Sequence, residues 1–132
     1  MAALAVVLAA PVSAQTLTLK ASVPFDFVVG GHTLLAGTYV VSSEGSLGVL
    51  AIRNESGGVA PTFIISNAVY GELDSSSGTL TFNRYGGDYF LARIWDGSQA
   101  TGRAIPMSRN EREKAKSASL GKPEVVTILA RR

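Results

Sequence analysis

Residues 17–29 read LTLKASVPFDFVV, and this stretch decides the fold class. Each odd position in it is apolar, and the even positions are polar or proline except at Val28. An alternation with period two predicts a β-strand that buries one face and exposes the other. Pro24 has no N–H to donate to a neighbouring strand, so we expect the strand to bend or to lie at a sheet edge there.

The rest of the chain consists largely of short apolar stretches separated by glycine-rich turns. Further strands are expected at residues 38–42, 47–53, 62–66, 79–85, 88–95, 101–105 and 125–130. About 7–8 short strands with turns of this kind are typical of two all-β architectures. We therefore predict an antiparallel β-sandwich or a flattened small barrel.

The turn Gly86-Gly87 predicts a β-hairpin with two open registers. A two-residue loop pairs Phe82 with Leu91, whereas a three-residue loop pairs Phe82 with Phe90. The second register gathers the apolar side chains on one face, and a slip of one residue would reverse both faces. We therefore predict the three-residue loop, with a positive φ at Gly87. The apolar face would then hold Leu80, Phe82, Phe90, Ala92 and Ile94.

Ser108 followed by Glu111 fits a capping box and predicts a helix over about residues 109–119. Gly121 and Pro123 then end the helix. Because few of its residues are apolar, we expect residues 108–120 to form a solvated surface connector before the last strand.

One hydrophobic core is expected from the apolar positions of these strands. Its predicted members are Leu17, Leu19, Val23, Phe25, Phe27, Tyr39, Val41, Leu50, Ile52, Phe63, Ile65, Leu80, Phe82, Phe90, Ile94, Val126 and Ile128.

Residues 1–14, MAALAVVLAAPVSA, predict export. A short apolar run, a proline and a small-residue cleavage pattern are typical of a secretory signal peptide, with cleavage after Ala14. No Lys or Arg precedes the run, so we expect a signal peptide truncated at its N-terminus. The alternative is an apolar first strand. The mature protein would be a single β domain, residues 15–132, in the periplasm or outside the cell.

Composition excludes several classes of site. The 132 residues include no Cys and one His, which excludes disulfides, thiolate catalysis, cysteine zinc sites and cages of several histidines. Residues 103–132 carry a net charge of +5 and residues 15–102 one of −3. The basic part has no nucleic-acid motif, so we expect a solvated basic face and no nucleic-acid partner. No later stretch is long enough for a membrane helix, and the sequence shows no cofactor motif.

Three segments together resemble a group of small, secreted, uncharacterised bacterial proteins of soil-type bacteria. They are VPFDFVVG at 23–30, LLAGTYVV at 34–41 and LTFNRYGGDYFL at 80–91, and the last is followed by Ile94-Trp95, Gly102-Arg103 and residues 108–113 of the same pattern. The resemblance covers most of the chain after residue 14, and the group usually has Pro where this chain has Leu35. It implies a secreted β domain and brings no activity, cofactor or catalytic residue with it.

Catalytic candidates are few. His32 falls in a predicted turn without the nucleophile and orienting acid that a general base requires, so we expect an exposed turn histidine. Paired carboxylates are the catalytic groups of glycosidases, but the acids here show no such spacing and are expected on the surface. These acids are Asp26, Glu72, Asp74, Asp88 and Asp96.

An aromatic surface is the main candidate for ligand binding. Tyr89, Leu91 and Trp95 alternate on the face opposite the predicted core, and exposed rings on a sheet can stack on sugars or anchor a partner. The candidate ligand-binding residues are Tyr89, Trp95, Tyr85 and Arg93. The alternative is that the helix or the C-terminal segment covers this face, because Leu91 and Trp95 are costly to expose.

The sequence leaves four functions open. We expect first a secreted, non-enzymatic β-domain protein with a structural or interaction role in the cell envelope. The second is a carbohydrate-binding module that recognises a polysaccharide through the exposed aromatic residues. The third is a fibre or adhesin subunit in which residues 17–29 add a strand to a neighbouring chain. A hydrolase with paired carboxylates comes last.

Overall fold

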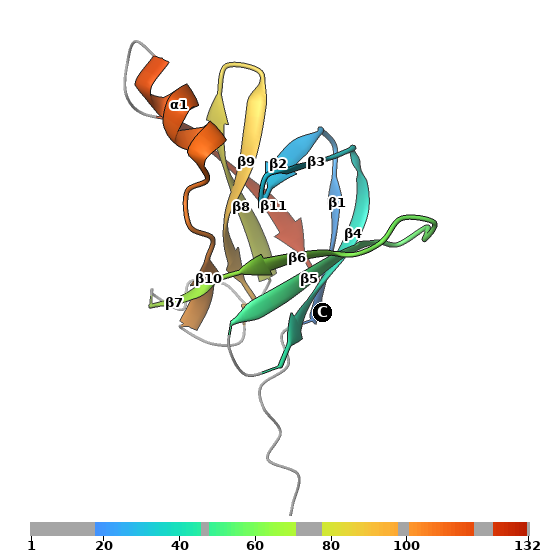
Figure 1. The fold of residues 1–132 in the computed structure, drawn as a ribbon. Coiled ribbons are helices and arrows are strands. Elements are labelled where there is room, and N and C mark those ends of the chain that lie inside the picture. Colours follow the sequence, from blue (N-terminus) through green and yellow to red (C-terminus); the bar gives the residue numbers. More distant parts are fainter. Residues whose placement is uncertain (1–17, 46–47, 71–77, 98–100, 118–122, 132) are drawn as a thin grey trace, which may run out of the picture.

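In the part of the chain that the structure describes, two β-sheets and one helix make up the fold (Figure 1). The structure is a computed structural model that describes residues 18–45, 48–70, 78–97, 101–117 and 123–131. The first sheet has the order β1 (Thr18–Val23), β4 (Gly37–Glu44), β5 (Val49–Asn54), β6 (Thr62–Ile65). The second has the order β11 (Glu124–Ala130), β8 (Gly78–Tyr85), β9 (Asp88–Trp95), β10 (Thr101–Ala104), β7 (Asn67–Tyr70).

Two three-residue strands and a helix complete the described part. β2 (Phe27–Val29) pairs with β3 (His32–Leu34) and meets β9, while α1 (Arg109–Ser117) precedes β11. The predicted all-β sandwich or flattened barrel, with its helix before the last strand, is confirmed. The strands are more numerous than predicted because several are short, and β7 was not predicted at all. The predicted signal peptide 1–14, Leu17, Glu72, Asp74 and residues 118–120 lie outside the described residues.

The stretch at residues 17–29 contributes to both sheets. β1 pairs with β4 in the first sheet, and β2 runs parallel to β9 in the second, where Val28 lies opposite Phe90. The break falls at Pro24, as the missing N–H predicts. Beyond it, the Asp26 carboxylate accepts a 2.8 Å hydrogen bond from the Ala36 N–H. The single segment 17–29, which the sequence predicts as one strand, therefore contributes a strand to each of the two sheets.

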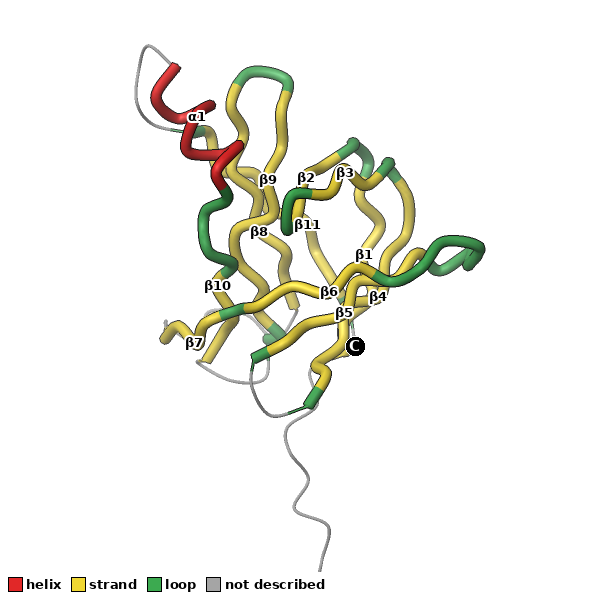
Figure 2. The backbone as a smooth tube through the Cα atoms, viewed as in Figure 1, coloured by secondary structure: helices red, strands yellow, loops and turns green. Residues whose placement is uncertain are grey.

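The two sheets also meet at both sides of the core. At one side, Lys20 and Arg131 form an isolated bridge with backbone hydrogen bonds of 2.7 and 2.9 Å. At the other, β6 continues through Ser66 into β7 and so passes from the first sheet to the second (Figure 2). The Arg103 guanidinium donates to the Ser66 hydroxyl at 2.8 Å and to its carbonyl at 2.7 Å, which fixes this crossing.

Most of the predicted core is confirmed. The buried cluster contains Leu19, Val23, Phe27, Tyr39, Val41, Leu50, Ile52, Leu80, Phe82 and Ile94 from the predicted set. Phe25, Val126 and Ile128 pack against it but are only partly buried. Phe90 is 4% exposed but lies outside this cluster.

The prediction was wrong for Phe63 and Ile65. These side chains are 58% and 68% exposed, and Ile64 between them is 5% exposed. The register of β6 places Ile64 opposite the buried Leu50, so its neighbours face outward. A continuous apolar run does not reveal which of its two faces is buried.

The predicted hairpin register was also wrong. Tyr85 pairs with Asp88 across a two-residue loop, and the positive φ of 63° belongs to Gly86, not Gly87. A positive φ at the first loop residue alone is the pattern of a type II′ turn. Phe82 consequently pairs with Leu91, which joins the core, while Phe90 faces the opposite side.

A β-bulge restores the apolar pairing further along this hairpin. The register shifts between Thr81 and Phe82, so that Leu80 pairs with Ile94. The extra residue on β9 is Ala92, which has no partner in the pairing. Both Leu91 and Ile94 therefore reach the core, a combination that neither uninterrupted register allows.

Candidate functional site

The four candidate ligand-binding residues lie in three different places. Tyr89 lies on the core side of β9, where its ring stacks on Phe25 with centroids 3.7 Å apart and an interplanar angle of 12°. The guanidinium carbon of Arg84 lies 5.3 Å from the Tyr89 ring centroid. The ring of Tyr89 therefore packs against other residues of the fold and does not form part of an exposed binding surface.

Tyr85 belongs to a contact between α1 and the β8–β9 hairpin. Its hydroxyl donates a 3.1 Å hydrogen bond to Glu111, and the Asn83 amide donates a second one of 3.1 Å to the same oxygen. Glu111 is 4% exposed, and its N–H donates to the Ser108 hydroxyl at 3.2 Å. Ser108 thus caps the helix as predicted, and the Glu111 carboxylate anchors the helix to the sheet.

The environment of Tyr85 suits a structural role. Its ring is 7% exposed and meets Phe90 edge to face, with centroids 5.8 Å apart. Burial, reinforced by the adjacent Glu111 carboxylate, raises the pKa of the Tyr85 hydroxyl to about 12. The hydroxyl therefore stays a hydrogen-bond donor at neutral pH and holds the helix in place.

Trp95 lies on the outer face of the second sheet, over Gly102 of the paired strand β10. A Cβ atom built on Gly102 would stand 2.5, 2.7 and 2.8 Å from Cε3, Cδ2 and Cζ3 of the indole. Three neighbouring ring atoms at nearly equal distance place that point above the ring face, not beside its edge. The indole therefore lies flat on the glycine, and its opposite face points away from the sheet.

Polar side chains lie beside Trp95 on this outer face, and the exposed Leu129 of β11 follows Thr79 in the same row. Trp95 pairs with Thr79 on β8, and Arg93 pairs with Thr81 in the adjacent row. We call these four residues the Trp95 face. Tyr85, six residues along β8 from Thr79, lies roughly 20 Å away by strand rise. Two of the four predicted residues, Trp95 and Arg93, therefore share one surface.

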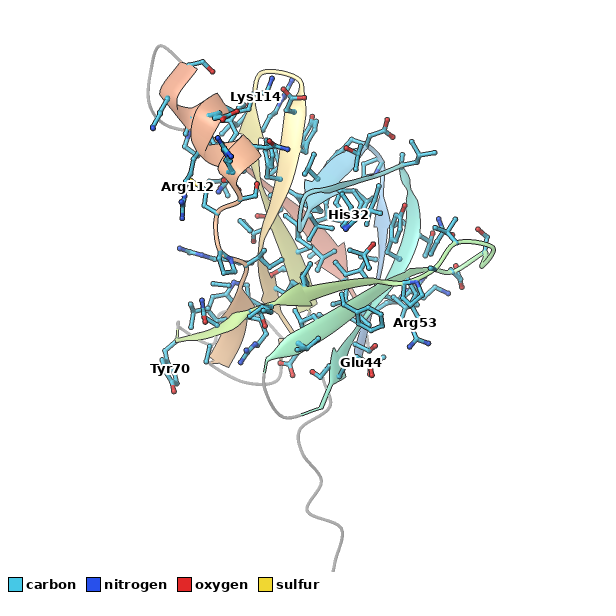
Figure 3. The ribbon with its side chains drawn as sticks, viewed as in Figure 1. His32, Glu44, Arg53, Tyr70, Arg112 and Lys114 are labelled. Atoms are coloured by element: carbon cyan, nitrogen blue, oxygen red, sulfur yellow. The ribbon has the colours of Figure 1, made fainter. Side chains whose placement is uncertain are left out.

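The catalytic candidates occupy surface positions. His32 is exposed at the start of β3, beside the β2–β3 turn (Figure 3). Asp26 bonds the backbone of Ala36, and Asp96 follows β9 half-buried. Asp88 forms a 2.9 Å ion pair with Lys114, with side chains 48% and 53% exposed. These contacts tie loops and the helix to the sheet.

A cleft of about 370 Å³ lies between α1 and strands β2 and β9. Asp88 and Glu113 bring two carboxylates to its lining, with Val28 and Phe90 as its apolar part. Asp88 is paired with Lys114, and Glu113 lies 3.6 Å from the Arg109 guanidinium. Both carboxylates are thus engaged by cations of the helix. Within the described ranges, no group of three or more metal-ligating side chains occurs.

The sequence did not reveal the most exposed apolar feature of the first sheet. Phe63 and Ile65 project from the outer face of β6, next to Ala51 and Val49 of β5. We call Phe63 and Ile65 the β6 ridge. The sequence does carry one signal for the β6 ridge, because residues 56–71 contain no charged side chain. Exposed apolar side chains grouped on one strand make this ridge a candidate interaction surface.

Ion pairs line the same outer face beside the β6 ridge. Glu44 of β4 and Arg53 of β5 are joined at 3.3 Å, and Figure 3 shows both side chains on this sheet. The cross-strand pair Ser42–Ala51 lies between the pair that holds Glu44 and the pair that holds Arg53. Ala51 is 0% exposed although it faces outward. Lys20 of β1 pairs with Glu55 beyond β5. An apolar centre with a polar border is the usual anatomy of a protein interface.

Comparisons with protein-family models, with curated proteins and with solved structures find no match. In the part of the chain that the structure describes, no helix has the length and apolar character needed to cross a bilayer. The two surfaces of this fold that bear on function are the β6 ridge and the Trp95 face.

Proposed function

We propose that this protein is an exported, non-enzymatic β domain that acts by binding a protein partner in the cell envelope. The β6 ridge carries the proposal, because Phe63 and Ile65 are 58% and 68% exposed on a regular strand. Large apolar side chains grouped on one strand and bordered by ion pairs are typical of an interaction surface. The signal-peptide pattern of residues 1–14 supports export.

Site-specific photo-crosslinking in cells tests this function. A variant with Phe63→p-benzoylphenylalanine should form a covalent adduct on irradiation. The matched control carries the same photoreactive residue at Leu129, which is 73% exposed on β11 of the other sheet. An adduct at position 63 and none at 129 supports the proposal, and the absence of any adduct at 63 contradicts it.

A second candidate function, carbohydrate binding, is favoured by the Trp95 face. An indole held flat against Gly102 turns its other face away from the sheet, and flat aromatic faces stack on sugar rings. The guanidinium of Arg93 and the hydroxyls of Thr79 and Thr81 are suitable hydrogen-bond partners for sugar hydroxyls.

Tryptophan fluorescence tests the second candidate directly, because Trp95 is the single tryptophan of the chain. A saturable change in emission with one polysaccharide of a panel, weakened in Arg93→Ala, would support carbohydrate binding. Emission that no polysaccharide changes would rule it out for the glycans tried and leave the β6 ridge as the functional surface.

A further inference from the structure

We propose that the partner of the β6 ridge is a second copy of this chain, bound face to face through the outer surface of β4, β5 and β6. The inference rests on the proposed function, since it assigns the occupant of the same ridge. Two features of the described residues favour a like copy: the neutral border and the self-complementary ridge. The turn beside the edge of β6 in addition favours docking on the face of the sheet.

A turn lies beside the edge of β6, the last strand of the first sheet among the described residues. The Ser66 N–H donates to the carbonyl of Gly48, which directly precedes β5. Along an antiparallel strand only alternate residues bond the same neighbour, so Ser66 and Ile64 face β5 and the Phe63 carbonyl points away from it. The turn at Gly30 lies there, since a Cβ built on that residue would stand 4.0 Å from the Phe63 oxygen and 2.7 Å from Ile64 Cγ2. A strand added at this edge would meet that turn beside Phe63, whereas the exposed side chains of Phe63 and Ile65 leave the face of the sheet open to a partner.

The border of the ridge is electrically neutral and already paired. Lys20 bonds Glu55 and Arg53 bonds Glu44, so two cations and two anions cancel on this face. A two-fold interface brings identical surfaces together, and any net charge on them would repel. The chain's excess positive charge lies instead in residues 103–132, whose described part holds the end of β10, α1 and β11, none of which belongs to the first sheet. This distribution suits a like partner on the first sheet.

The ridge is complementary to itself about a two-fold axis. Two β6 strands that face each other in antiparallel directions place Phe63 opposite Ile65 of the partner subunit. The two sheets would stack about 10 Å apart, as sheets do in sandwiches. Each ring then packs against a β-branched side chain, a favourable pairing between strands.

Sedimentation velocity over a concentration series of the mature protein tests the inference. We expect twice the chain mass at tens of micromolar and dissociation on dilution. The double variant Phe63→Ser, Ile65→Ser should raise the dissociation constant by about 100-fold or more, as the loss of central apolar anchors does. Both side chains are exposed, so circular dichroism should confirm an unchanged fold.

A matched control and a second measurement make the outcomes distinct. Leu129→Ser removes an equally apolar side chain, 73% exposed on the other sheet, and should leave the dimer intact. Photo-crosslinking at position 63 should give an adduct of twice the chain mass. A wild-type monomer at the highest concentration, or equal loss of the dimer in Leu129→Ser, would overturn the inference.

The crosslinking result also separates the inference from the function on which it rests. An adduct at position 63 that contains only a different protein would overturn the dimer and leave the proposed binding function standing. A monomer without any adduct at position 63 would overturn both.

Discussion

Substituting Gly102→Ala tests the position of Trp95 with one added methyl group. The new Cβ would stand 2.5 Å from Cε3 of the indole, whereas carbon atoms in contact prefer about 3.5 Å or more. The ring must therefore retreat by about 1 Å, which lifts it from the sheet and exposes more of it. Gly102 lies in β10 and has no positive φ, so backbone strain does not add to the effect.

The expected loss of stability follows from two opposed effects. Overpacking of this kind costs typically about 1–3 kcal/mol. Replacing glycine by alanine recovers about 0.4–1 kcal/mol by restricting the unfolded chain. The free energy of unfolding should therefore fall by about 1–2 kcal/mol, measured by urea denaturation, and the Trp95 emission should shift to the red with stronger acrylamide quenching.

Gly87→Ala supplies the matched control. A Cβ built on Gly87 meets nothing within 4 Å, and its φ is not positive. That variant should be neutral or more stable by a few tenths of a kcal/mol, with unchanged emission. If Gly102→Ala behaves in the same way as Gly87→Ala, the indole does not lie on Gly102, and the geometry of the Trp95 face is wrong.

Three further predictions follow from the same packing. Phe82→Ala should lower the free energy of unfolding by about 3–5 kcal/mol in denaturant melts, because Phe82 is 0% exposed and meets two other rings edge to face; a loss below about 1 kcal/mol would contradict its core position. Gly48→Ala should lower the free energy of unfolding by about 2–4 kcal/mol in urea melts, since the φ of Gly48 is 77° and the Arg103 guanidinium fills the space of a Cβ. A neutral effect would refute the position of Arg103 where the chain passes from β6 to β7. Folding raises the pKa of the Tyr85 hydroxyl from 10.0 to about 12. The protonated hydroxyl therefore stabilises the fold fully below pH 10, and about 1–3 kcal/mol of the free energy of unfolding is lost as the pH rises from 10 to 12. Tyr85→Phe should show a shallower alkaline loss of stability in pH-dependent melts, and an unchanged slope would contradict the contact with Glu111.

The local pattern predicted the parts of the fold that depend on one strand at a time. The alternation in residues 17–29 placed Leu19, Val23 and Phe27 in the core, because side-chain direction in a strand follows from position alone. The capping residue Ser108 predicted the helix start for the same reason, since a cap is a contact within one turn.

The register between paired strands could not be predicted from the local pattern of apolar and polar residues. The hairpin prediction assumed an uninterrupted register, and the bulge at Ala92 lets Leu91 and Ile94 both reach the core. The apolar run around Ile64 gave no alternation, so only the pairing with β5 decides that its neighbours face outward. The contact of Trp95 with Gly102 likewise depends on the pairing of β9 with β10.

The same limit applied to the candidate site. The sequence placed Tyr85, Tyr89 and Trp95 together because they lie close along one hairpin. Tyr85 turned out to bond Glu111 of α1, and Tyr89 stacks on Phe25, a residue far away in sequence. Neither partner can be found from spacing within the hairpin, so only the surface around Trp95 keeps the predicted outward position.

The way the two sheets close bears on how this protein can associate. Strand addition requires a free sheet edge. Arg131 bonds the backbone of Lys20 beside β1, and the turn at Gly30 lies against β6. A fibre built by adding a strand beside residues 17–29 would therefore have to break the two hydrogen bonds between Lys20 and Arg131 first. Association through the exposed face of β6 breaks no backbone hydrogen bond, because Phe63 and Ile65 already point outward. Face-to-face docking is thus the less costly route for this fold.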